Sequence, residues 1–114
     1  DKDTDGRADH LYRPTIRMFK NARTHLVDNG DISDGLAPSY CVEGLLYNVP
    51  DIEFGGSFEL SFRNCLRWLN RASFGRFRCQ NDLVWLFGPT PEQWEQPKAR
   101  EFVDKLVLLW RRWH

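Results

Sequence analysis

The apolar residues of this 114-residue chain recur at spacings of three and four in four separate segments, and the first two of these segments end at glycine and at proline. Such spacing places apolar side chains on one face of a helix, whereas a half-buried strand alternates apolar and polar residues. Amphipathic helices of this kind bury their apolar faces by packing against one another. The sequence therefore predicts an all-α domain, a compact bundle of about four to five helices.

The first two expected helices are separated by a short polar loop. The first covers residues 12–27, tolerates Pro14 in its first turn and ends at Asn29-Gly30. The second is shorter and mostly apolar, and it lies between Pro38 and Pro50. The apolar face of the first helix is formed by Tyr12, Ile16, Phe19, Leu26 and Val27.

Two more helices are expected in the second half of the chain. Residues 72–91 between them follow neither period for long, so we expect loops with a short helical turn there. The third helix has an apolar stripe of Phe58, Phe62, Cys65, Leu66 and Leu69. The last helix is expected to start at Pro97 and run to the end of the chain, with one side formed by Ala99, Phe102, Val103, Leu106, Trp110 and Trp113.

Composition limits the function classes that fit. Lysine plus arginine number 16 and so do aspartate plus glutamate, so the formal net charge is zero and any anion site must be local. Three cysteines without a CxxC motif predict a reduced, cytoplasmic location. No apolar run approaches the roughly 18 residues that span a bilayer, so no membrane partner is expected. The three histidines are too scattered in sequence to predict a metal site.

The chain begins with Asp rather than Met, and its first residues are polar and acidic. We therefore expect residues 1–11 to be an acidic linker that arrives from an upstream domain. Residues 12–114 are expected to form a single helical domain.

A stripe of basic residues runs along the first expected helix. Arg13, Arg17 and Lys20 follow at spacings of four and three, and no acid on that helix stands three or four positions from any of them. An external anion, or acids from elsewhere, should offset their repulsion, although a solvated face is the simpler interpretation of the stripe alone. Arg23 falls on the face assigned to the core, so a structural pair with Glu43 is expected.

Ser39 and Tyr40 follow Pro38 in the first turn of the second expected helix. The backbone N–H groups and the positive end of the helix dipole favour a phosphate there. A serine hydroxyl donates to phosphate oxygens, and a tyrosine ring offers a stacking face for a base. The alternative makes Ser39 an ordinary polar residue near a helix start and Tyr40 a core aromatic.

The stretches IRMFKNARTHLVDNG and LAPSYCVEGLLYNVP, with the later WLFG and the last helix, carry a family resemblance. They resemble the helical C-terminal half of bacterial cyclic-oligonucleotide synthases, relatives of cyclic GMP-AMP synthase and oligoadenylate synthase. The resemblance implies that Lys20 and Ser39 contact the donor triphosphate and that Tyr40 stacks on the donor base. Arg17, on the same stripe as Lys20, is a further candidate for a phosphate contact.

The same resemblance implies a nucleotidyltransferase that makes cyclic or linear oligonucleotide second messengers from nucleoside triphosphates in anti-phage defence. In that family the catalytic carboxylates and the Mg²⁺ ions belong to an upstream catalytic domain. We therefore expect nucleoside triphosphates and that domain as partners. No catalytic residue is expected in this chain, and no activity from it alone.

Two other functions remain open at this stage. The chain could belong to a nucleotidyltransferase that modifies RNA or protein, or it could be a helical interaction module whose basic stripe binds an acidic partner without nucleotide. Nucleic-acid binding by a tryptophan-rich surface is also open, although packing of the last helix explains these residues more simply. That surface would comprise Trp94, Trp110, Trp113, Arg111 and Arg112.

Overall fold

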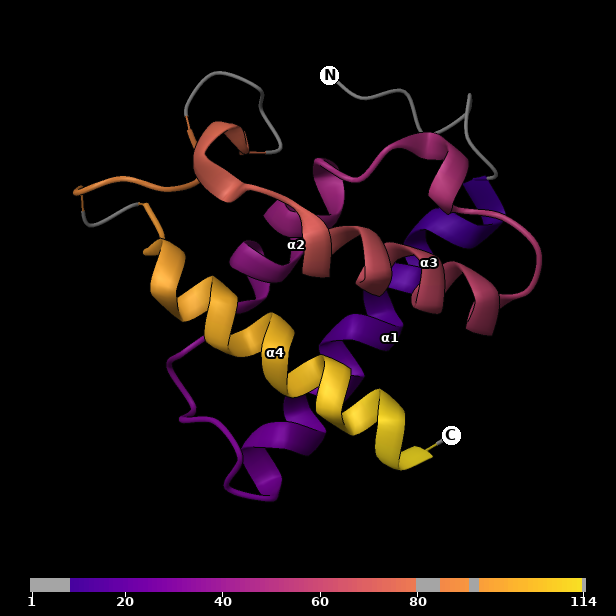
Figure 1. The fold of residues 1–114 in the computed structure, drawn as a ribbon, viewed down its shortest axis with the longest axis horizontal. Helices are drawn as coiled ribbons and strands as arrows, with labels where there is room; N and C mark the ends of the chain where they lie inside the picture. Colours follow the sequence, from indigo (N-terminus) through magenta and orange to yellow (C-terminus); the bar gives the residue numbers. More distant parts are fainter. Residues whose placement is uncertain (1–8, 80–84, 91–92, 114) are drawn as a thin grey trace.

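The structure is a computed structural model that describes residues 9–79, 85–90 and 93–113. Within these residues the chain forms four α-helices (Figure 1). They are α1 (Asp9–Asp28), α2 (Ser39–Tyr47), α3 (Phe58–Arg71) and α4 (Gln96–Trp113). Two 3-10 turns join them, η1 (Asp51–Glu53) after α2 and η2 (Phe74–Arg76) after α3. The predicted all-α class is confirmed, and the weakly periodic segment after α3 holds the expected short helical turn.

Helix α1 begins at Asp9, three residues before the expected start at Tyr12. The reason is packing, because Leu11 is buried and its carbonyl accepts a hydrogen bond from the buried Thr15 hydroxyl. Pro14 therefore lies inside the helix rather than at its very start. Most of the predicted acidic linker, residues 1–8, lies outside the described residues.

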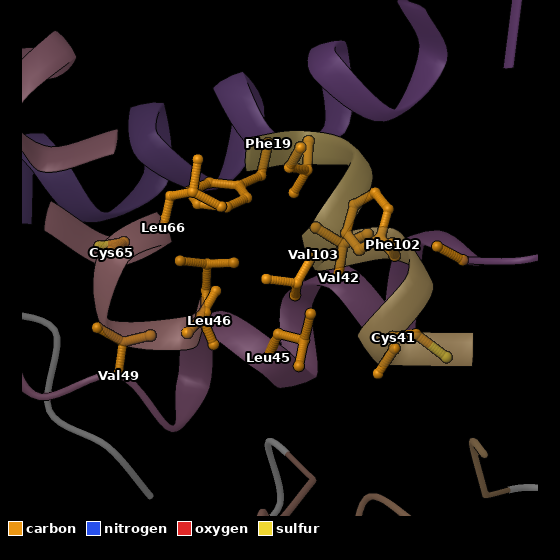
Figure 2. Close-up of a cluster of buried hydrophobic side chains, with 14 of the residues drawn as sticks. Phe19, Cys41, Val42, Leu45, Leu46, Val49, Cys65, Leu66, Phe102 and Val103 are labelled. Carbon is orange, nitrogen blue, oxygen red and sulfur yellow. The ribbon is translucent and has the colours of Figure 1, made fainter. Parts of the chain in front are cut away.

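The core forms where all four helices meet. Helix α1 packs against α2, α3 and α4, and the ring centroid of its Phe19 lies 4.4 Å from that of Phe62 on α3. Figure 2 shows side chains from the four helices pointing toward one another. The labelled members of this cluster are Phe19, Cys41, Val42, Leu45, Leu46, Val49, Cys65, Leu66, Phe102 and Val103.

Buried aromatic side chains hold the irregular segment before α4 against the bundle. The rings of Phe74, Phe87 and Trp94 stack in succession with centroids 5.6 Å apart. The Trp94 indole N–H donates to the Leu36 carbonyl at 3.0 Å, which ties this segment to the loop between α1 and α2. Residues 85–90 and 93–95 are therefore held by buried rings and isolated backbone bridges rather than by regular secondary structure.

Two expectations for tryptophans were wrong. Trp113 is 52% exposed instead of packed, because it lies in the last turn of α4 and its ring reaches only the edge of His25, 5.7 Å away. Leu109 is buried on the core side in its place. Trp94 is 4% exposed, so it does not share a surface with Trp110 and Trp113.

No helix among the described residues combines the length and the apolar character that crossing a membrane requires.

Truncation of a core leucine should lower the free energy of unfolding more than truncation of a surface leucine. Leu45→Ala and Leu66→Ala are each expected to lower the free energy of unfolding by about 2–5 kcal/mol, because both side chains are buried among the four helices. Leu108→Ala is the matched control, since Leu108 lies on α4 with 53% of its surface exposed. Urea unfolding followed by circular dichroism measures the differences. Equal losses for Leu108 and Leu45 would contradict the described core.

Candidate functional site

The start of α2 points toward solvent although most of the helix is buried. Five of its nine residues are buried, whereas Ser39 and Tyr40 are both exposed, with 53% of the Tyr40 surface accessible. Pro38 occupies the N-cap position without a side-chain cap, and no acid stands in the first turn. The positive end of the helix dipole is therefore not offset by a carboxylate of that turn. The alternative in which Tyr40 is a core aromatic is wrong.

Lys20 on α1 reaches the same side of α2. Its ammonium group forms an ion pair with the Glu43 carboxylate, and the two side chains are 32% and 33% exposed. Glu43 stands four residues after Ser39 and three after Tyr40, so these three side chains share one side of α2. The ion pair thus brings the Lys20 ammonium to the side of α2 that carries both candidate residues. Their roles in binding a nucleotide stay predictions.

The expected Arg23–Glu43 pair is wrong. Arg23 donates instead to the backbone carbonyls of Ala37 and Asp34, the latter at 2.8 Å, and Lys20 takes Glu43. The loop between α1 and α2 folds back over α1, so its carbonyls lie within hydrogen-bond distance of the Arg23 guanidinium. With 18% of its side chain exposed, Arg23 holds in place the loop that leads into Ser39.

The rest of the basic stripe is solvated. Arg13 and Arg17 are exposed, and neither forms an ion pair with an acid whose side chain the structure describes. Arg17 stands three residues before Lys20, on the same side of α1. This placement is compatible with the predicted auxiliary phosphate contact, which no observation here tests.

Tyr40 also lines a groove of about 450 Å³ that the sequence did not predict. Its opposite wall comes from the segment before α4, where the Thr90 hydroxyl donates to Gln93 Oε1 at 2.8 Å and Gln93 donates to the Trp85 carbonyl at 3.1 Å. Two residues of the wall form an ion pair, with Lys98 Nζ 3.6 Å from Glu95 Oε2. Because the apolar residues of this segment follow no helical or strand period, the sequence did not predict that it would lie opposite Tyr40. The groove is lined by Gly35, Pro38, Tyr40, Gly88, Pro89, Thr90, Gln93, Trp94, Glu95 and Lys98.

Cys41, the residue after Tyr40, offers no nucleophile. Burial raises the pKa of the Cys41 thiol to about 11, although a hydrogen bond with Tyr40 and the charge of Lys98 act in the opposite direction. The thiol is therefore protonated near neutral pH and behaves as a small core residue. The described residues also contain no group of three His, Cys, Asp or Glu side chains that could hold a metal ion.

The structure is thus an all-α domain that carries a partly exposed lysine, an exposed helix start and an exposed aromatic ring on one side, a surface of Lys20, Ser39, Tyr40 and Glu43 that we call the Lys20 face. The sequence model of the cGAS/DncV-like nucleotidyltransferase C-terminal helical domain matches residues 1–111. The chain therefore belongs to this family of C-terminal helical domains, as the resemblance predicted.

Individual relatives agree with this assignment. Over 102 residues the chain is 55% identical to a cyclic UMP-AMP synthase of Rhodothermus marinus, covering 90% of this chain and 35% of the relative. It is 38% identical to the cyclic nucleotide synthase CdnE01 of Staphylococcus haemolyticus, covering 97% of this chain and 38% of that protein. The chain thus spans about a third of the length of these curated relatives.

A solved structure shows the same fold. The Rhodothermus marinus CdnE c-UMP-AMP synthase, determined with Apcpp and Upnpp, superposes with a TM-score of 0.87 at 53% sequence identity. The match covers 92% of this chain and 36% of that one.

Replacing the charged residues of this face should affect stability unequally. Lys20→Ala is expected to cost at most about 1 kcal/mol, because the ion pair with Glu43 is partly solvated. Arg23→Ala should cost about 1–3 kcal/mol, because two loop carbonyls lose their donor. Arg17→Ala, exposed on the same helix, should leave unfolding in urea unchanged. A loss for Lys20→Ala as large as for Leu45→Ala would make its charge structural.

Proposed function

We propose that this domain binds the donor nucleoside triphosphate of a nucleotidyltransferase that makes cyclic or linear oligonucleotide messengers. The observation that carries the proposal is the shared side of α2, where Glu43 holds Lys20 beside the exposed Ser39 and Tyr40. A related synthase that was solved with two nucleotide analogues supports the ligand class.

Each group on this face has a distinct task. The Lys20 ammonium carries three donors, so it can keep Glu43 and still donate to a phosphate oxygen. Ser39 adds a hydroxyl donor, and the start of α2 adds the positive end of its dipole. Tyr40 stacks on the base that projects from the triphosphate. Glu43 acts on the nucleotide indirectly, by fixing where the Lys20 ammonium lies.

The Tyr40 groove gives the base a place to lie. Its volume of about 450 Å³ falls within the range of small-molecule sites, and its wall offers the Thr90 hydroxyl and the Gln93 amide as hydrogen-bonding groups. A base stacked on the Tyr40 ring would present its polar edge to that wall. Arg17 could add a second cation for the phosphates, one turn before Lys20 on α1.

The remaining parts of the reaction are proposed to lie outside this domain. An upstream catalytic domain would supply the carboxylates that bind Mg²⁺, which activate the attacking hydroxyl and stabilise the leaving pyrophosphate. All three cysteines are free thiols, which fits a cytoplasmic enzyme. A role in anti-phage defence is part of the same proposal.

Donor kinetics of the full-length protein test the face directly. Tyr40→Ala and Lys20→Ala should each weaken use of the donor nucleotide by about 1–3 kcal/mol, roughly 5- to 150-fold, because each removes one contact to it. Tyr40→Phe keeps the ring and should behave like the unaltered protein. Measuring the rate of product formation against the concentration of each labelled nucleoside triphosphate gives the effect. Unchanged kinetics in both alanine variants would remove Lys20 and Tyr40 from the site.

Product analysis separates this function from its alternatives. With Mg²⁺ and labelled nucleoside triphosphates, full-length protein should release cyclic or linear oligonucleotides, and the 114-residue chain should release none. Turnover by the chain alone would contradict the division between two domains. Label transferred to added RNA or to protein would favour a modifying transferase. Binding of an acidic partner with no use of nucleotide would favour an interaction module.

A further inference from the structure

Three arginines line a groove at the far end of α2 from Ser39. The groove has a volume of about 600 Å³ and runs between η1, the second half of α3 and η2. Arg67 and Arg71 stand four residues apart on α3, and Arg76 comes from η2. All three are exposed. The described residues of the lining are Asn48, Glu53, Asn64, Arg67, Trp68, Arg71, Ala72, Ser73, Arg76 and Phe77.

These arginines are not neutralised within the described residues. Arg67 donates to the Asn64 side-chain carbonyl at 3.2 Å, and neither Arg71 nor Arg76 lies within ion-pair distance of a described acid. Among the described residues of the lining Glu53 is the one acid, so three arginines stand against one carboxylate there. Like charges four residues apart on a helix repel one another. An anion bound between them would remove that repulsion.

The other walls of the groove are already fixed. Trp68 stacks on Phe77 with ring centroids 5.8 Å apart and planes 21° from parallel. The Asn48 side chain donates to the Gly44 carbonyl at 2.7 Å, donates to the Arg78 carbonyl and accepts from the Arg78 N–H. These contacts hold η2 against α2 and α3, and they bring Arg76 to the two α3 arginines.

We infer that this groove binds the phosphate groups of a nucleotide-sized ligand, at a site separate from the Lys20 face. Guanidinium groups match phosphate oxygens in bidentate pairs, and sites for small molecules measure roughly 300–1,000 Å³. The groove shares no lining residue with the Tyr40 groove. Asn48 and Ser39 stand nine residues apart along α2, roughly 13 Å at the helical rise. The inference is therefore independent of the proposed donor site.

Isothermal titration calorimetry of the 114-residue chain with tripolyphosphate and with ATP tests the groove. The double substitution Arg67→Gln with Arg71→Gln should raise the Kd for both ligands at least tenfold. Arg63→Gln is the matched control, because Arg63 is exposed on α3 one turn before Arg67 but outside the lining, and it should change the Kd less than twofold. Arg67 and Arg71 both lie on α3, away from Lys20, Ser39 and Tyr40, so the result is separate from the fate of the donor site.

Four results would overturn the inference. The first is an equal loss for Arg63→Gln and the double variant, which would show general surface charge. The second is binding of a ten-nucleotide RNA that tripolyphosphate does not displace, which would replace the nucleotide-sized ligand by a polymer. The third is binding by the chain but not by full-length protein, which would show that another domain covers the groove. The fourth is no binding of either probe by the folded chain at low salt.

Discussion

The burial of α2 is the constraint on which the rest of the domain depends. Nine residues are too few for a stable isolated helix, so α2 exists because its apolar residues pack against the other helices. Its buried residues lie between Cys41 and Leu46, and Gly44 allows Leu86 to pack closely against the helix: a methyl group there would lie 2.8 Å from Leu86 Cδ1. This packing does not constrain the residues on the solvent side of α2, and that side carries Ser39, Tyr40 and Glu43.

Two side chains far apart in sequence then fix the loop that leads into α2. Arg23 binds its carbonyls from α1, and the Trp94 indole binds the Leu36 carbonyl from the segment before α4. Leaving the buried Leu36 carbonyl or the part-buried Ala37 carbonyl without a donor would destabilise the loop, so both contacts favour one loop conformation. The start of α2 is thereby held in place before any ligand arrives. Such preorganisation lowers the cost of binding.

Helical periodicity predicted the four helices because burial of one face leaves a regular trace in sequence. It could not identify the partner of Arg23, since a helical pattern assigns a residue to a face but does not show which loop folds over that face. Residues 85–95 lack any period, so the packing of Leu86 against Gly44 of α2 was not foreseen. The spacing of Arg67 and Arg71 was visible in the sequence. The arrival of Arg76 beside them depends on the Asn48 hydrogen bonds, which no local pattern encodes.

The two cationic faces differ in how their charge is balanced. At the Lys20 face Glu43 already offsets the charge of the ammonium, so the proposed triphosphate site also uses Ser39, the helix start and groups outside this chain. At the arginine groove positive charge is in excess, so an anion gains from every guanidinium it contacts. In a chain with no net charge, neither face can rely on attraction from the whole molecule. We therefore propose the groove as the face at which the isolated domain holds phosphate best, whereas the proposed donor site on the Lys20 face would need groups outside this chain to complete it.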